Sequence, residues 1–174
     1  GIGGNGHVGA NEPFSIRNSR TRLCTLDPVT RRAAASDFFG ETNVPTQAIT
    51  MGMGTIQEAR KILLVALGEN KSSIIRALTQ GGITERVPAS HLQDHPDSMV
   101  IVDEASASQL DFYQTPWSFE DVEWTDLLIK RAVLWLCEQA GKALLKLNDH
   151  DFREHNLHKL QGMICFHCHF LKQQ

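Results

Sequence analysis

The sequence is poor in the features that mark secreted, membrane-spanning or nucleic-acid-binding proteins. It has 4 cysteines among 174 residues, too few for a disulfide scaffold. No stretch approaches the roughly 20 apolar residues of a membrane-spanning helix, and no secretory leader pattern opens the chain. The balance of 17 Lys and Arg against 20 Asp and Glu supplies no positive field for nucleic acid or an anionic membrane. We therefore expect a cytoplasmic protein that binds a small molecule or another protein.

The length is sufficient for one sizeable hydrophobic core. A domain of this size buries roughly 70% of the surface of its unfolded chain, and 41% of the residues here are hydrophobic. The chain begins with Gly1 rather than Met and enters a glycine-rich turn with no strand ahead of it. We therefore expect it to be a piece of a longer protein.

The order of apolar runs predicts an α/β fold with a parallel sheet. The predicted strands are 20–26, 48–53, 61–67 and 99–102, and the predicted helices are 30–39, 55–60, 71–80 and 89–93. Thr55 is a candidate amino-terminal cap for the second of these helices. The continuous apolar run at 61–67 is typical of a strand covered on both faces. Strands that alternate with helices in this way indicate right-handed crossovers between parallel strands.

The character of the chain changes after the predicted globular part at 1–106. Residues 107–123 contain aromatic side chains without a clear period, so we expect a linker or arm. Residues 124–147 form the longest stretch with a helical period and carry one apolar stripe. This pattern predicts a helical extension that packs on the core or on a partner. Residues 148–174 lose this pattern and are predicted to form a tail.

The opening hexapeptide GIGGNG satisfies the G-x-G-x-x-G string of dinucleotide-binding turns. That string must open a helix whose amino terminus faces a pyrophosphate. The following residues, HVGANEPFS, are poor helix formers. The sequence therefore favours a loop with several positive φ angles over a dinucleotide site.

His7 and Glu12 lie in this same loop. A neutral imidazole beside a carboxylate is a sound acid/base pair, because the carboxylate can orient the ring and raise its pKa toward the working pH. Two polar residues in a loop are more often simply solvated. Their spacing alone leaves both interpretations open.

Four sequence blocks carry a resemblance to a known family. They are GIGGNGHVGANEP, SRTRLCTL, AITMGMGTIQEARKILLVALGENK and HPDSMVIVDEAS, in this order within residues 1–106. The blocks resemble the glucosamine-6-phosphate deaminase (isomerase) family. The resemblance implies a Rossmann-like parallel sheet with flanking helices, and a hydrolase or isomerase that converts glucosamine 6-phosphate and water to fructose 6-phosphate and ammonia. We expect a sugar phosphate as ligand and neither cofactor nor metal, and leave a homo-oligomer open.

The resemblance also implies roles for individual residues. His7 would be the ring-opening acid/base at the sugar ring oxygen, and Glu12 would orient it and tune its pKa. Lys71 would bind the sugar phosphate. A lysine at the start of a helix suits that role, because the cation and the helix amino terminus both favour a dianion. Without the resemblance, Lys71 would be interpreted as a solvated surface lysine.

Three departures from the family pattern bear on activity. Asn5 stands where the family usually has an aspartate, and an amide cannot supply the charge that stabilises a protonated His7. Asp37 replaces a phosphate-binding arginine and would repel phosphate unless Arg31 or Arg32 reaches in. The family's amino-terminal half, with the aspartate that moves the proton between carbons, is absent from this chain. We therefore expect a carboxyl-terminal part of a deaminase-like protein that is inactive alone, with Asn5 as a weakened third catalytic residue.

The tail holds the string CFHCH, which fits the C-x-x-C-H pattern for haem attachment. A zinc site is chemically possible with Cys165, Cys168 and His169 together with His155 or His158. No second C-x-x-C pair supports it, so a poorly ordered or locally helical tail is favoured. Three functions stay open: the deaminase, a sugar-phosphate binding or regulatory module that has lost the chemistry, and a metal- or haem-binding tail on an inert scaffold.

Overall fold

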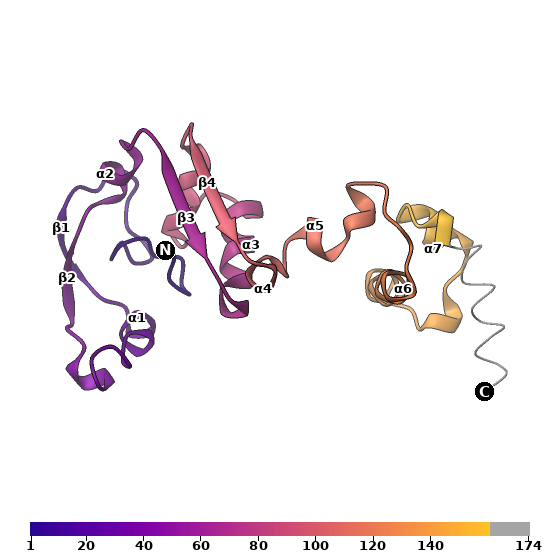
Figure 1. The fold of residues 1–174 in the computed structure, drawn as a ribbon, viewed down its shortest axis with the longest axis horizontal. Coiled ribbons are helices and arrows are strands. Elements are labelled where there is room, and N and C mark those ends of the chain that lie inside the picture. Colours follow the sequence, from indigo (N-terminus) through magenta and orange to yellow (C-terminus); the bar gives the residue numbers. More distant parts are fainter. Residues whose placement is uncertain (161–174) are drawn as a thin grey trace. The chain divides into compact units, whose positions relative to one another are not determined.

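The computed structural model describes residues 1–160 (Figure 1). The chain divides into two compact units, Gly1–Gln114 and a second unit that begins at Thr115. No helix within the described part of the chain combines the length and the apolar character needed to cross a bilayer. The string CFHCH lies outside the described residues.

The first unit is built on a parallel strand pair joined through a helix. Strand β3 (Ile62–Ala66) leads through α3 (Ser72–Gln80) to β4 (Ser98–Val102), which pairs with β3 in parallel. This β–α–β arrangement confirms the predicted α/β class with flanking helices. The buried side chains of its core are Ile2, Met53, Leu64, Ala66, Ile74, Ile75, Leu78, Ala89 and Leu92.

One face of the β3–β4 sheet is open. Leu64 and Ala66 point into the core, with 2% and 3% of their surface exposed. The alternate residues Leu63 and Val65 are 56% and 45% exposed. The prediction that 61–67 is covered on both faces is therefore wrong for the described residues, because only the side facing α3 and the core is packed.

Two further strands of the described residues form a separate antiparallel sheet. Strand β1 (Arg22–Thr25) pairs with β2 (Gln47–Thr50), with Leu23 opposite Ile49. The predicted strand at 48–53 is thus shorter and does not join the parallel sheet. The apolar run AITMGM is compatible with parallel and with antiparallel pairing. The course of the chain between β1 and β2, and not the run itself, determines that the two strands pair antiparallel.

Two short helices of the first unit differ from their predicted bounds. Asp27 caps α1 (Pro28–Ala33) by accepting a hydrogen bond from the Val29 N–H, so this helix begins earlier and ends earlier than 30–39. Helix α2 (Met53–Gln57) follows Gly52, and Thr55 lies inside it rather than at its cap.

The first unit also contains several short helices. They are α4 (Glu104–Ala107), α5 (Asp111–Gln114) and the 3-10 helices η1 (Glu41–Asn43), η2 (Glu69–Lys71) and η3 (Pro88–Asp94). Of these, η2 directly precedes α3, and η3 corresponds to the predicted helix at 89–93.

The second unit contains α6 (Asp126–Ala140) and α7 (Asp149–Glu154), with η4 (Pro116–Ser118) and η5 (Leu144–Lys146). Thr125 caps α6, and Gly141 ends it at a φ of 61°, so the helix is shorter than 124–147. Its apolar stripe packs inside this unit, on a cluster formed by Trp117, Ala132, Leu136, Phe152, Leu157 and Leu160.

This packing corrects two predicted boundaries. The expected linker 107–123 contains α5 and η4, and its Trp117 is a buried core residue. The described part of the expected tail, 148–160, holds α7, and its Phe152 and Leu157 are buried. Aromatic and leucine side chains of these segments complete a core that the helical period of α6 alone did not reveal.

Candidate active site

The opening loop holds His7 by close backbone packing. The Gly3 N–H donates to the His7 carbonyl at 3.0 Å, and the Gly6 N–H donates to the Gly3 carbonyl at 2.9 Å. Gly6 has a φ of 86°, which agrees with the predicted loop rather than a helix. A Cβ at Gly3 would lie 2.0 Å from Cε1 of His7, so only glycine leaves room for the imidazole there.

Asn5 bridges the imidazole and the carboxylate. His7 Nδ1 lies 2.8 Å from Asn5 Oδ1, and Asn5 Nδ2 donates to Glu12 Oε2 at 2.9 Å. An amide oxygen only accepts hydrogen bonds, so Nδ1 carries the proton of the neutral ring. The other ring nitrogen, Nε2, is then the one that can accept a proton. Glu12 Oε2 lies 3.6 Å from His7 Nδ1 and is linked to the ring through the Asn5 amide.

The first turn of α1 supports the same ring. The Thr30 hydroxyl lies 3.1 Å from His7 Nδ1, and the Asp27 backbone N–H donates to Glu12 Oε1 at 3.2 Å. Sequence reasoning missed Thr30, which is 23 residues from His7. The Asp27-Pro28 pair marks a helix start and could have placed Thr30 in the first turn of α1.

The surroundings of His7 favour its neutral form. Burial of the imidazole lowers its pKa below the ordinary value of 6.5, and the nearby Lys71 ammonium lowers it further. The Glu12 and Asp27 carboxylates oppose this change but do not outweigh it. His7 is therefore an unprotonated base near neutral pH.

A cavity of about 490 Å³ brings the predicted site residues together. His7, Asn5 and Lys71 all line it, and Lys71 reaches it from the end of η2. Glu12 is not part of the lining and is 8% exposed behind Asn5. Further lining residues are Gly1, Ile2, Gly3, Gly4, Gly9, Val29, Thr30, Ala33, Ala34, Asp37 and Asn70.

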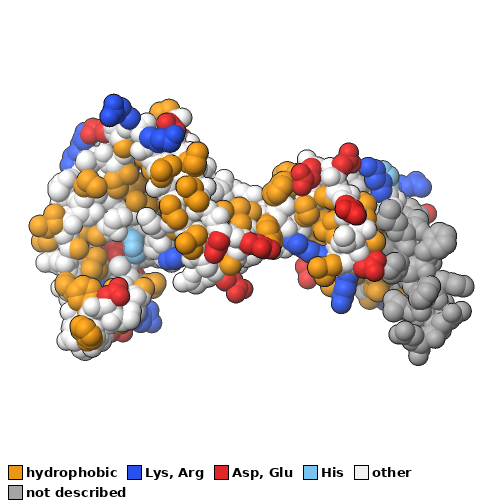
Figure 2. All heavy atoms as spheres, viewed as in Figure 1, with side chains coloured by type: hydrophobic (Ala, Val, Ile, Leu, Met, Phe, Trp, Pro, Cys, Tyr) orange, Lys and Arg blue, Asp and Glu red, His pale blue; other side chains and the backbone are white. Residues whose placement is uncertain are grey.

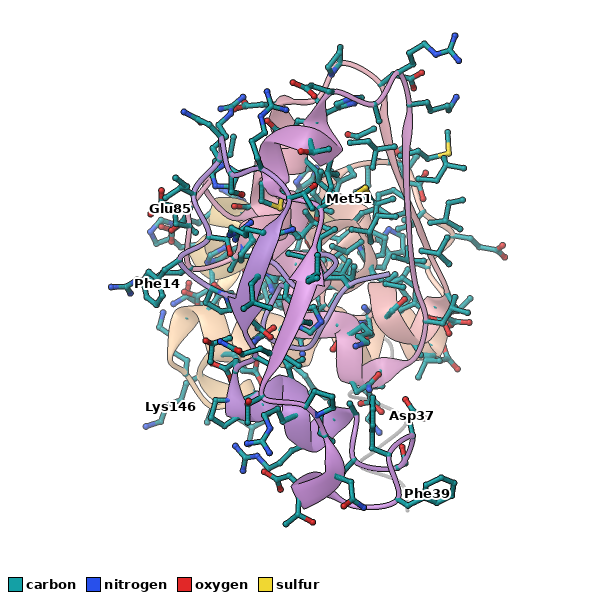
Figure 3. All side chains as sticks on the ribbon, turned by 90° about the vertical axis from the view of Figure 1, so that its left-hand side faces the viewer. Phe14, Asp37, Phe39, Met51, Glu85 and Lys146 are labelled. Carbon is teal, nitrogen blue, oxygen red and sulfur yellow. The ribbon has the colours of Figure 1, made fainter. Side chains whose placement is uncertain are left out.

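The cavity is only weakly cationic. Asp37 lines it, in the segment after α1. Phe39 of the same segment projects into solvent, with 96% of its surface exposed (Figure 3). Arg31 donates to the carbonyls of Glu41 and Val44, and neither it nor Arg32 lines the cavity. Lys71 is thus the only lysine or arginine among the described lining residues.

Comparison with known proteins identifies the relatives of this chain. No protein-family model matches it. A glucosamine-6-phosphate deaminase-like protein of Bacteroides thetaiotaomicron is 42% identical over 163 residues, which are 94% of this chain and 25% of that protein. A glucosamine-6-phosphate deaminase of Corynebacterium kroppenstedtii is 50% identical over 111 residues, 64% of this chain and 43% of that protein. The chain belongs to the glucosamine-6-phosphate deaminase family.

A solved structure of a monomeric glucosamine-6-phosphate deaminase of the NagB superfamily matches with a TM-score of 0.61 and 44% identity. This match covers 62% of the chain and 45% of that protein. The chain thus spans less than half the length of each of these relatives and matches the carboxyl-terminal part of the deaminases. The Bacteroides match is long enough to include most of the second unit, whereas the Corynebacterium match is close in length to the first.

The described residues of this chain contain no group of three or more His, Cys, Asp or Glu side chains arranged to hold a metal ion. His155, one of the two histidines considered for a zinc site, packs edge-on against Trp135 with the ring centroids 5.5 Å apart. The cysteines considered with it lie outside the described residues.

Proposed function

We propose that the chain carries the ring-opening and phosphate-binding residues of a glucosamine-6-phosphate deaminase. The reaction converts glucosamine 6-phosphate and water to fructose 6-phosphate and ammonia. One observation carries the proposal: His7, Asn5 and Lys71 line the same cavity, while Glu12 is hydrogen-bonded to Asn5 behind it. The 50% identity to a glucosamine-6-phosphate deaminase supports this substrate.

His7 is suited to open the sugar ring. Its Nε2 would take the proton of the C1 hydroxyl as the bond between C1 and the ring oxygen breaks, and would return that proton to the ring oxygen. The Asn5 amide oxygen and the Thr30 hydroxyl stabilise the Nδ1–H throughout. The lowered pKa of His7 keeps the starting form neutral at pH 7, as a general base requires.

Lys71 is suited to hold the sugar phosphate. It lies directly before α3, so the amino terminus of that helix would add to the attraction of its ammonium for an anion. The Asp37 carboxylate opposes this attraction, because it lines the same cavity. We therefore propose weaker phosphate binding than a site with a second cation would give.

The aldose–ketose step needs a further base. Moving a proton from C2 to C1 requires a group beside those two carbons, and Asp37 is the only carboxylate among the described lining residues. We have assigned Asp37 to the phosphate end by its place in the family pattern. We therefore propose that the isomerase base comes from another part of the deaminase fold and that this chain alone is inactive.

A second candidate function is a sugar-phosphate binding or regulatory module without turnover. Asn5 favours it, because an amide at 2.8 Å from His7 Nδ1 stabilises a protonated ring less than an aspartate does. Asp37 favours it as well, since its charge weakens the hold on phosphate. The two functions differ in whether bound glucosamine 6-phosphate is consumed.

A chimera tests both functions. The 111 matched residues of the Corynebacterium kroppenstedtii deaminase are replaced by their counterparts from this chain, and ammonia release from glucosamine 6-phosphate is measured. We expect turnover, and a loss of about 100-fold or more in the His7→Gln chimera. Tight binding without ammonia supports the binding module instead. Neither binding nor turnover by a folded chimera refutes both functions.

A further inference from the structure

The Thr30 hydroxyl accepts a hydrogen bond from the imidazole of His7. Its oxygen lies 3.1 Å from His7 Nδ1. Asn5 Nδ2 donates to Glu12, so the Asn5 amide oxygen faces the ring, and it also accepts from the backbone N–H of His7 at 3.3 Å. This arrangement sets the proton of the neutral ring on Nδ1, where the Asn5 and Thr30 oxygens share it. A hydroxyl that accepts in this way still has its own proton to donate.

The proton of the Thr30 hydroxyl finds no acceptor in its own helix. A threonine inside a helix can donate to a carbonyl three or four residues earlier. Thr79 of α3 does so, with its hydroxyl 2.8 Å from the Ile75 carbonyl. Thr30 lies in the first turn of α1, and the residue four positions earlier, Leu26, precedes the helix. Within the described part of the chain, the Thr30 hydroxyl therefore has a donor and no partner for it.

This donor lies at the candidate site. Thr30 is half-buried and lines the same cavity as His7. Figure 2 shows a histidine side chain in a hollow on the surface of the first unit, so small molecules can reach this region. A ligand that displaces solvent from the cavity either accepts the proton of the Thr30 hydroxyl or leaves a donor unsatisfied, which weakens binding.

Two carboxylates hold Thr30 in this position. Asp27 caps α1 by accepting from the Val29 N–H at 2.7 Å. The backbone N–H of Asp27 donates to Glu12 Oε1 at 3.2 Å, so Glu12 ties the start of α1 to the loop that carries His7. The hydroxyl is thus placed before a ligand arrives, and less conformational entropy is lost on binding.

We propose that Thr30 contacts the substrate and donates a hydrogen bond to a sugar oxygen at the C1 end of an amino-sugar phosphate. His7 acts at that end under the proposed function, on which this inference rests, and Thr30 Oγ1 is 3.1 Å from the His7 ring. A protonated amine has no lone pair, so the ammonium group at C2 cannot replace that oxygen. The hydroxyl keeps its proton during the reaction and selects a ligand with an acceptor at this position.

Substitutions of Thr30 in the chimera test the proposal, with glucosamine 6-phosphate as the probe. Thr30→Val keeps the shape of the side chain without the hydroxyl and should raise KM about fivefold or more. Thr30→Ser keeps the hydroxyl and should restore KM. The matched control is Thr42→Val, an exposed threonine of η1 outside the cavity lining, and it should change nothing. An unchanged KM in Thr30→Val, or a loss confined to kcat, overturns the proposal, because Thr30 would then act only through His7.

Two further measurements separate this proposal from the proposed function. Nuclear magnetic resonance of the imidazole nitrogens in the unaltered full chain should show the neutral His7 proton on Nδ1. A proton on Nε2 would make Thr30 the donor to Nδ1 and would also overturn the proposal. A chimera that releases no ammonia counts against the deaminase function, and the dissociation constant of the unconsumed glucosamine 6-phosphate, from calorimetry, then replaces KM with the same expected changes. A folded chimera that does not bind this sugar overturns both.

Discussion

Replacing Asn5 by aspartate should raise the pKa of His7. The substitution sets a carboxylate where the amide oxygen lies, 2.8 Å from His7 Nδ1. Two charges about 4 Å apart interact by roughly 4 kcal/mol at an effective dielectric constant of about 20. The gain should be smaller than this, because the His7 side chain is 19% exposed and Glu12 already lies 3.6 Å away. We expect a rise on the order of 1–2 pKa units.

Nuclear magnetic resonance titration of the histidine Cε1–H signals measures this change. The His7 signal is assigned as the one absent from the His7→Gln variant. Asn5→Ser serves as the control, because it removes the amide without adding a charge and should leave the pKa of His7 below 6.5. An unchanged or lowered pKa in Asn5→Asp would show that Asn5 does not govern the protonation of the ring.

Two further outcomes follow from the same structure. Gly3→Ala should lower turnover of the chimera at least tenfold, because the added Cβ displaces the His7 ring. Gly4→Ala is the control and should not lower turnover, because its added Cβ meets nothing within 4 Å. Equal effects of the two substitutions would argue against this packing. Burial lowers the pKa of both His7 and His91, so the stability they contribute is present above pH 6.5 and is lost as the pH falls through their folded pKa values. Urea unfolding should therefore give a smaller free energy of unfolding at pH 5.5 than at pH 7.5. His91→Leu should reduce this difference, because it removes a buried ring whose two nitrogens have no hydrogen-bond partner within the described structure.

The parallel strand pair could be predicted because its signals are local. Continuous apolar runs mark β3 and β4, and a glycine follows the helical stripe of α3. The antiparallel pairing of β2 with β1 could not be predicted in this way. Pairing depends on where the chain returns after α1, and the period of a strand carries no information on its partner.

The candidate site shows the same division between local and distant information. His7, Asn5 and Glu12 share one short loop, and their hydrogen bonds follow from that proximity. Thr30 joins them only because α1 folds back on the loop. The exposed side of the β3–β4 sheet could not be predicted either, because an apolar run indicates that a strand is suited to burial and does not indicate which of its faces is packed.

We propose that His7 performs chemistry and Lys71 binds phosphate in one cavity. The most direct test is the steady-state kinetics of three chimera variants with glucosamine 6-phosphate. His7→Gln should lower kcat with little change in KM, whereas Lys71→Met should raise KM at least tenfold and Lys61→Met, its matched control, should change neither. A His7→Gln chimera with the kcat of the unaltered chimera would contradict the role proposed for His7.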